Sequence, residues 1–233
     1  MNAIKRNIPN SITCCNLFSG CVACVFAFWG NFDYAAFAVV AAAVFDFFDG
    51  FAARLLKCSS PLGVELDSLA DMVSFGLVPA VAMYCLWDVA PASETLPEWA
   101  RYLTLIIVAF SALRLAKFNI DDTQTTEFCG LPTPANGLFC LSLAMLAQSG
   151  DITFAKEIIL LTSIVMACLL ISPIRMFALK FKGFGWSGNE LRYSFLVACV
   201  VLIAAFTKYA IPSIILIYIV ISTLRWLISS RKA

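Results

Sequence analysis

The chain has 233 residues, of which 61% are hydrophobic and only 13% are charged, and its formal net charge is +1. This balance excludes an ordinary water-soluble globular domain and is typical of a chain embedded in a membrane. The near-neutral charge, without a block of like charges, gives no indication of nucleic-acid binding. Histidine, the commonest general base and metal ligand, does not occur. Any chemistry is therefore expected to depend on carboxylates.

Apolar segments follow one another along the whole chain. A helix needs about 20 residues to cross a bilayer. Hydropathy predicts eight such helices, at about 11–29, 33–56, 63–87, 99–118, 133–149, 154–174, 193–207 and 211–228. The predicted fold is therefore all-α, a polytopic membrane helix bundle with about eight transmembrane helices. We expect residues 1–233 to form a single integral membrane domain.

The basic residues predict how this bundle is oriented. An even number of crossings puts both termini on one side. That side would carry Lys5, Arg6, Arg54, Lys57, Arg114, Lys117, Arg175, Lys180, Lys182, Arg192, Arg225, Arg231 and Lys232, against Arg101, Lys156 and Lys208 on the other. Because cytoplasmic loops are enriched in Lys and Arg, we expect both termini in the cytoplasm. The chain would be a multi-pass protein of the cell (inner) membrane.

Four aspartates interrupt the second and third predicted helices. Asp46 and Asp49 lie in AAAVFDFFDGFAARLL, and Asp67 and Asp71 lie in GVELDSLADMVSFGLVPA. Charged side chains inside a membrane are unfavourable and are usually functional. We therefore expect a functional site within residues 46–71, near the cytoplasmic ends of these two helices.

The spacing on the second predicted helix gathers functional groups on one face. At 100° per residue, Asp46, Asp49, Gly50 and Ala53 occupy about one third of the helix circumference, and Arg54 borders that face. Two carboxylates thus share a face with two small residues, which leave space beside the carboxylates.

The third predicted helix brings a matching face. Asp67 and Asp71 are four residues apart, and Gly63 lies one turn earlier on the same face. The short connection KCSSPL makes the two helices antiparallel neighbours. All four carboxylates are therefore expected to converge.

Four converging carboxylates would repel one another unless cations neutralise them. Two divalent ions balance four aspartates, and a site made of oxygen ligands alone favours Mg²⁺ or Mn²⁺. Two such ions can bridge a diphosphate and assist in-line displacement at phosphorus. Arg54 is suited to bind a phosphate oxygen, and Gly50, Ala53 and Gly63 would leave room for a flat base. The alternative from another class is a cation carrier, in which the aspartates form a transport site.

The complete pattern, D-x-x-D-G-x-x-A-R, eight residues, then G-x-x-x-D-x-x-x-D, occupies residues 46–71. It resembles the signature of the CDP-alcohol phosphatidyltransferases at every fixed position. This resemblance implies a helical membrane fold, usually a homodimer, in which Asp46, Asp49, Asp67 and Asp71 bind two divalent cations. It also implies that Asp71 is the general base. By the same resemblance Gly50 and Arg54 contact the CDP-lipid. Further residues of the CDP-lipid site are Asn10, Ala53, Ser60 and Gly63.

Other segments resemble the integral phosphatidylserine synthases within that family. They are IPNSITCCNLFSG, SFGLVPA, RLAKFN, GLPTPANG and ISPIRMFALKFKGFGW, which together extend over most of the chain. The resemblance implies CDP-diacylglycerol and L-serine as substrates, with phosphatidylserine and CMP as products. A relative that uses glycerol 3-phosphate or inositol phosphate as the acceptor is the nearer alternative, and it should need extra basic residues.

A serine acceptor also has to be recognised as a zwitterion. Arg114, Lys117 and Asn119, near the cytoplasmic end of the fourth predicted helix, could bind its carboxylate. They could equally be anchors at the membrane surface, as the positive-inside rule expects. Direct displacement is favoured over a covalent intermediate, because the chain has no histidine nucleophile and metal-bound carboxylates attack poorly.

Overall fold

A computed structural model describes residues 3–121, 127–178, 185–186 and 188–230, and the structural statements below refer to these residues. Four basic residues that contribute to the predicted orientation lie outside them: Lys180, Lys182, Arg231 and Lys232. The resemblance segment that begins at residue 171 is likewise described only in part.

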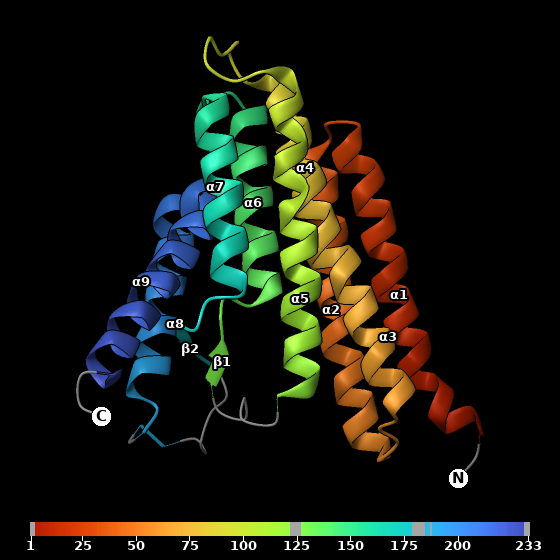
Figure 1. Ribbon diagram of the computed structural model, residues 1–233. Helices are drawn as coiled ribbons and strands as arrows, with labels where there is room; N and C mark the ends of the chain where they lie inside the picture. The colour runs from red at the N-terminus through yellow and green to blue at the C-terminus, as the bar shows by residue number, and fades with distance from the viewer. Residues whose placement is uncertain (1–2, 122–126, 179–184, 187, 231–233) are drawn as a thin grey trace.

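Helices make up most of the described chain (Figure 1). The N-terminal half contains α1 (Ala3–Phe28), α2 (Phe32–Leu56), α3 (Pro61–Asp71), the π-helix η1 (Met72–Leu77), α4 (Val78–Val89), the 3₁₀-helix η2 (Glu98–Leu105) and α5 (Ile106–Ile120). After it come β1 (Glu127–Cys129), α6 (Thr133–Gln148), α7 (Lys156–Leu170), β2 (Arg175–Phe177), α8 (Glu190–Phe206), the 3₁₀-helix η3 (Thr207–Tyr209) and α9 (Ala210–Ser230). Each of the eight predicted segments largely coincides with one helix or with a continuous run of helices.

Five helical stretches in the described residues are long and apolar enough to cross a membrane. They are Asn7–Phe28, Phe32–Leu56, Pro61–Val89, Glu98–Ile120 and Glu190–Ser229. The helices α6 and α7, with 16 and 15 residues, are shorter than the roughly 20 residues that a crossing needs. The last stretch contains both α8 and α9, which pack against each other. The fold is thus that of a helical membrane protein, and the count of eight crossings stays a prediction.

The continuous rod formed by α3, η1 and α4 lies at the centre of the bundle. Its most apolar window is 61% buried, whereas the corresponding windows of the other four stretches are 17–28% buried. Phe75, Met83 and Trp87 on this rod are almost fully buried. Large apolar side chains such as Phe37, which is 73% exposed, cover the outside instead. This inside-out distribution is suited to a lipid environment, in which apolar side chains need not be hidden from water.

A short antiparallel sheet, which the all-α prediction does not include, pairs β1 with β2 and sets Phe128 opposite Met176. The sixth predicted helix extends to residue 174, but α7 ends at Leu170 because Pro173 cannot continue a helix. The backbone groups beyond Pro173 then find partners in β1. Gly130, with a φ of 78°, leads the chain from β1 to α6, and a Cβ there would lie 2.2 Å from the Leu170 carbonyl oxygen.

The start of α1 and the end of α9 lie at the same end of the bundle (Figure 1). The connection between α2 and α3 and the small sheet also lie toward this end, whereas residues 90–97 are at the opposite end. The two ends of the described chain therefore share one side, as an even number of crossings requires. Which side faces the cytoplasm stays a prediction.

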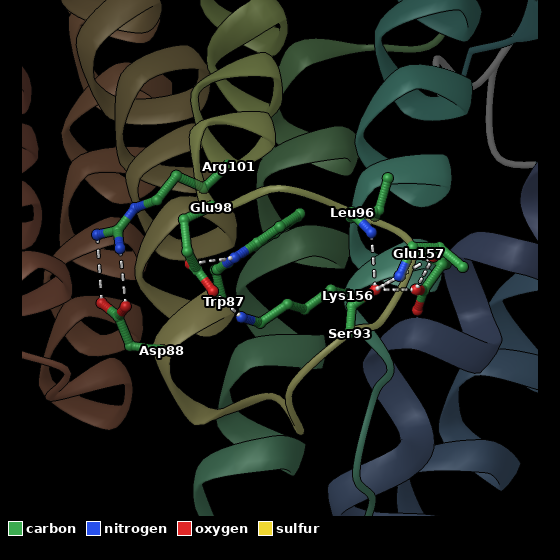
Figure 2. A network of polar contacts seen from close by, with 9 residues as sticks. Trp87, Asp88, Ser93, Leu96, Glu98, Arg101, Lys156 and Glu157 are labelled. Atoms are coloured by element: carbon green, nitrogen blue, oxygen red, sulfur yellow. Dashed lines mark hydrogen bonds and ion pairs between the residues drawn. The ribbon is translucent and has the colours of Figure 1, made fainter.

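A polar network ties helices together at the end opposite the termini (Figure 2). Lys156, at the start of α7, has a side chain that is only 8% exposed, and its Nζ lies 2.6 Å from Oε1 of Glu98. The indole nitrogen of Trp87 donates to Oε2 of the same carboxylate at 3.0 Å. Close by, Arg101 and Asp88 form a second ion pair at 2.9 Å, in which the cation is more exposed than Lys156. Glu98 thus links α4, η2 and α7.

We expect Glu98→Ala to lower the Tm of the detergent-solubilised protein by several degrees, because it leaves the buried Lys156 ammonium and the Trp87 N–H without their partner. The matched control is Asp88→Asn, which removes an exposed carboxylate and leaves the Arg101 guanidinium stacked on Tyr84. It should change the Tm by less than about 1 °C. Circular dichroism during heating measures both values. Equal Tm losses in the two variants would contradict the assigned role of Glu98.

Candidate metal and ligand site

The turn between α2 and α3 makes the two aspartate-bearing helices antiparallel. Lys57 adopts a left-handed backbone conformation, with a φ of 50°, and ends α2. Ser60 begins α3: its hydroxyl oxygen accepts a hydrogen bond from the Gly63 N–H at 3.1 Å, and Pro61 occupies the first helical position. These are ordinary signals for the end of one helix and the start of the next. They set the motif residues of α2 beside those of α3.

Three of the four predicted ligands meet across this helix pair. Carboxylate oxygens of Asp46 and Asp49 on α2 and of Asp67 on α3 all lie within 4.8 Å of one another. Oδ2 of Asp49 and Oδ1 of Asp67 are buried and have no hydrogen-bond partner. Buried carboxylate oxygens without donors are unfavourable, and three neighbouring negative charges repel one another. A divalent cation would correct both defects, and a donor set of oxygens alone suits Mg²⁺ or Mn²⁺.

Asp71, the last residue of α3, is not in the group whose oxygens all lie within 4.8 Å of one another, but its charge acts on Asp46. Its Oδ1 accepts a hydrogen bond from Nδ2 of Asn16 on α1 at 3.2 Å. It is still near enough to interact electrostatically with Asp67 and with Arg114. The four predicted ligands therefore form a tight cluster of three carboxylates with a fourth nearby, which has its own hydrogen bond to Asn16.

A cleft beside the cluster brings together the other predicted residues of the motif region. It is bounded by α1, by α2, by the connection that follows α2 and by α3. Its lining includes Asn10, Thr13, Asp49, Gly50, Ala53, Arg54, Ser60, Gly63 and Asp67. A Cβ on Gly63 would lie 3.2 Å from Oδ1 of Asn10 and 3.3 Å from Oγ of Ser60. The small residue therefore keeps the cleft open between two polar side chains, and Arg54 adds a positive charge.

A second cavity involves two of the three predicted acceptor residues. Arg114 and Lys117 line it, together with Asp121, Cys129 and the end of α7. Arg114 is buried, its Nη1 donates to Oγ1 of Thr133 at 3.3 Å, and its Nε has no hydrogen-bond partner.

The third predicted acceptor residue, Asn119, is placed differently. It is not part of the lining of the second cavity. Its Nδ2 instead donates to Oγ of Ser68 at 2.9 Å. Ser68 is the neighbour of Asp67 on α3, so Asn119 ties α5 to the helix that carries the carboxylates.

Two functional candidates on α1, Thr13 and Asn16, are not among the predicted site residues. Thr13 lines the cleft and interacts with the carboxylate of Asp49, and Asn16 bonds to Asp71. Both side chains are buried. Their spacing of three residues, which places both on one face of α1, is the available signal, because polar side chains inside membrane helices usually have a specific partner.

Comparisons with known proteins agree with this geometry. Residues 6–172 match the family model for CDP-alcohol phosphatidyltransferase. A CDP-diacylglycerol–serine O-phosphatidyltransferase of Bacillus subtilis is 37% identical over 134 residues, which cover 58% of this chain and 72% of that protein. A protein of the same name from Helicobacter pylori is 28% identical over 226 residues, or 94% of this chain and 90% of the relative. One from Methanocaldococcus jannaschii is 33% identical over 132 residues, or 57% and 58% of the two chains.

We expect Asp49→Asn and Asp67→Asn each to weaken Mn²⁺ binding by about 100-fold, because each removes charge and an unpartnered buried oxygen from the cluster. The matched control is Asp33→Asn, which changes an exposed aspartate at the other end of α2 and should leave binding unchanged. Electron paramagnetic resonance of free Mn²⁺ measures the affinity. If all three variants bound Mn²⁺ like the wild type, the cluster would not be the metal site.

Proposed function

The chain belongs to the CDP-alcohol phosphatidyltransferase family, and from this premise we propose that it transfers the phosphatidyl group of CDP-diacylglycerol to L-serine, releasing phosphatidylserine and CMP. The observation that supports the reaction best is the cluster of Asp46, Asp49 and Asp67. Asp49 and Asp67 line a cleft that also holds Arg54. The names of the relatives support serine as the acceptor, one of them over 94% of this chain.

CDP-diacylglycerol would bind with its head group in the cleft between α1, α2 and α3. Arg54 supplies a fork of donors for a phosphate oxygen, and its positive charge offsets part of the negative charge of the diphosphate. Gly50, Ala53 and Gly63 leave space for the cytosine base. Asn10 and Ser60 would give polar contacts at the same wall, on either side of Gly63.

Asp46, Asp49, Asp67 and Asp71 would hold two divalent cations, Mg²⁺ or Mn²⁺. The two unpartnered carboxylate oxygens support this fit. When bound, such ions supply Lewis-acid stabilisation of the charge that develops on the phosphate oxygens.

Asp71 is proposed as the general base. It would accept the proton of the serine hydroxyl while that oxygen forms a bond to the phosphorus of the lipid and the bond from phosphorus to the CMP oxygen breaks. Its hydrogen bond to Asn16 and its electrostatic interaction with Arg114 distinguish it from the other three carboxylates and support this role. Direct displacement needs no covalent intermediate, consistent with a sequence that contains no histidine nucleophile.

Serine would enter through the second cavity. Arg114 supports this assignment, because its guanidinium is buried with an unpartnered Nε, lines the cavity and interacts electrostatically with Asp71. Lys117 adds a second positive charge for the carboxylate of the amino acid. Asn119 would act indirectly, by holding α3 through Ser68. We further propose that the protein is a homodimer in the inner membrane, with its active site facing the cytoplasm.

The first experiment measures CMP release by purified protein in mixed micelles of CDP-diacylglycerol with Mn²⁺ or Mg²⁺. We expect release that depends on serine, and a loss of more than about 1,000-fold in Asp71→Asn, because the base is removed. Parallel reactions contain glycerol 3-phosphate, inositol phosphate or no acceptor. Release with another acceptor alone would reassign the product. The absence of release with every acceptor, together with metal flux in vesicles, would favour a cation carrier.

We expect Lys117→Gln to raise the KM for serine by about 10-fold and to leave the KM for CDP-diacylglycerol unchanged, because an ion pair with the serine carboxylate is lost. The matched control is Arg101→Gln, which removes a positive charge from η2, at the other end of the continuous helical run that η2 and α5 form. Initial rates at varied serine concentration measure both. An unchanged KM for serine in Lys117→Gln would remove Lys117 from the acceptor site.

A further inference from the structure

The π-helix η1 begins directly after Asp71 and is held tightly from three sides. From α1, a Cβ on Gly20 would lie 2.3 Å from Oγ of Ser74. From α6, a Cβ on Gly137 would lie 3.3 Å from the carbonyl oxygen of Phe75. From α5, Ser111 packs against Gly76. Single π turns are rare and often occur at functional sites. Here the wide turn is fixed in place by close contacts with three other helices.

Ser74, inside η1, is fully buried and points its hydroxyl at α1. The hydroxyl donates to Oδ1 of Asn16 at 2.7 Å and lies 3.3 Å from the carbonyl oxygen of the same residue. Asn16 is also fully buried, and its Nδ2 donates to Oδ1 of Asp71 at 3.2 Å. One chain of hydrogen bonds therefore leads from η1 through α1 to the carboxylate at the end of α3.

The direction of this chain of hydrogen bonds follows from which groups can donate. An ionised carboxylate only accepts hydrogen bonds, so the Asn16 amide has to present its NH₂ group to Asp71. The amide oxygen then faces Ser74, which can donate to it. If the hydroxyl were absent, the amide would lose the contact that opposes its rotation. Ser74 thus fixes Asn16, and Asn16 fixes one oxygen of Asp71.

We propose that Asn16 is a positioning residue that orients the general base, and that Ser74 acts only through Asn16. This inference rests on the proposed function of Asp71. The π turn contributes to this orientation, because it contains Ser74 and places the Ser74 hydroxyl against the Asn16 amide. Asp71 lies directly before it, at the end of α3. A carboxylate that rotates freely would accept the proton from serine in only a fraction of its orientations.

The test compares Ser74→Ala with Ser111→Ala. Each variant removes one buried hydroxyl beside η1, but only Ser74 bonds to Asn16, and the Ser111 hydroxyl has no hydrogen-bond partner. We expect Ser74→Ala to lower kcat by about 10-fold and Asn16→Ala to lower it by about 100-fold, with the KM values for serine and CDP-diacylglycerol within about twofold of wild type. Ser111→Ala should keep the wild-type kcat.

The double variant and two measurements without turnover separate positioning from packing. If Ser74 acts only through Asn16, the double variant Asn16→Ala/Ser74→Ala has the kcat of Asn16→Ala alone. The Tm of the metal-free protein should be similar in Ser74→Ala and Ser111→Ala. Stabilisation by CDP with Mn²⁺, read as a thermal shift, should remain as in the wild type, because the cleft is unchanged.

Three results would overturn the inference. The first is equal kcat values in Ser74→Ala and Ser111→Ala. The second is a kcat loss in the double variant that equals the product of the losses in Asn16→Ala and Ser74→Ala. The third is a loss of kcat in Ser74→Ala that is accompanied by a matching loss of Tm or of the CDP-dependent thermal shift. Each of these requires an active wild type. A wild type that releases no CMP with serine would instead overturn the proposed function, so the two failures are distinguishable.

Discussion

Mutual repulsion among the carboxylates is the constraint on which the rest of this structure depends. Asp46, Asp49 and Asp67 are held with oxygens within 4.8 Å of one another inside an apolar bundle, where negative charges without a counter-charge are strongly disfavoured. The compact turn at Lys57 and Ser60 directs α3 back toward the aspartates of α2. The packing of α1 along α2, and of α3 against α1, resists their separation. The proposed cations would balance these charges without a change in the helix packing.

The sequence predicts the carboxylate cluster and the cleft well, because both depend on local rules. Spacing on an α-helix determines which side chains share a face, and a short connection makes consecutive helices neighbours. Gly50, Arg54 and Gly63 accordingly lie together in the cleft. Helix spacing and short connections do not predict which side chains of α1 contact the aspartates. Asn16 meets Asp71 across 55 residues of sequence, and such a pairing follows from tertiary packing alone.

The remaining differences also have tertiary causes. The spacing of apolar residues does not predict the π turn of η1, because no local sequence signal marks it. The turn is accompanied by close packing of Gly20 and Gly137 from other helices. Asn119 lies close in sequence to Arg114 and Lys117, which suggests a shared site. Its side chain instead donates a hydrogen bond to Ser68 on α3. The small sheet arises because Pro173 ends a helix that hydropathy alone would extend.

The two cavities are lined by different parts of the chain, one by α1, α2 and α3 and the other by α5, α7 and β1. In the proposed assignment, the lipid and the amino acid would therefore enter by separate cavities. Neither substrate would have to leave a shared passage before the other arrives. This assignment would allow a ternary complex in which donor and acceptor are present together, with an excess of either substrate leaving the entrance of the other open.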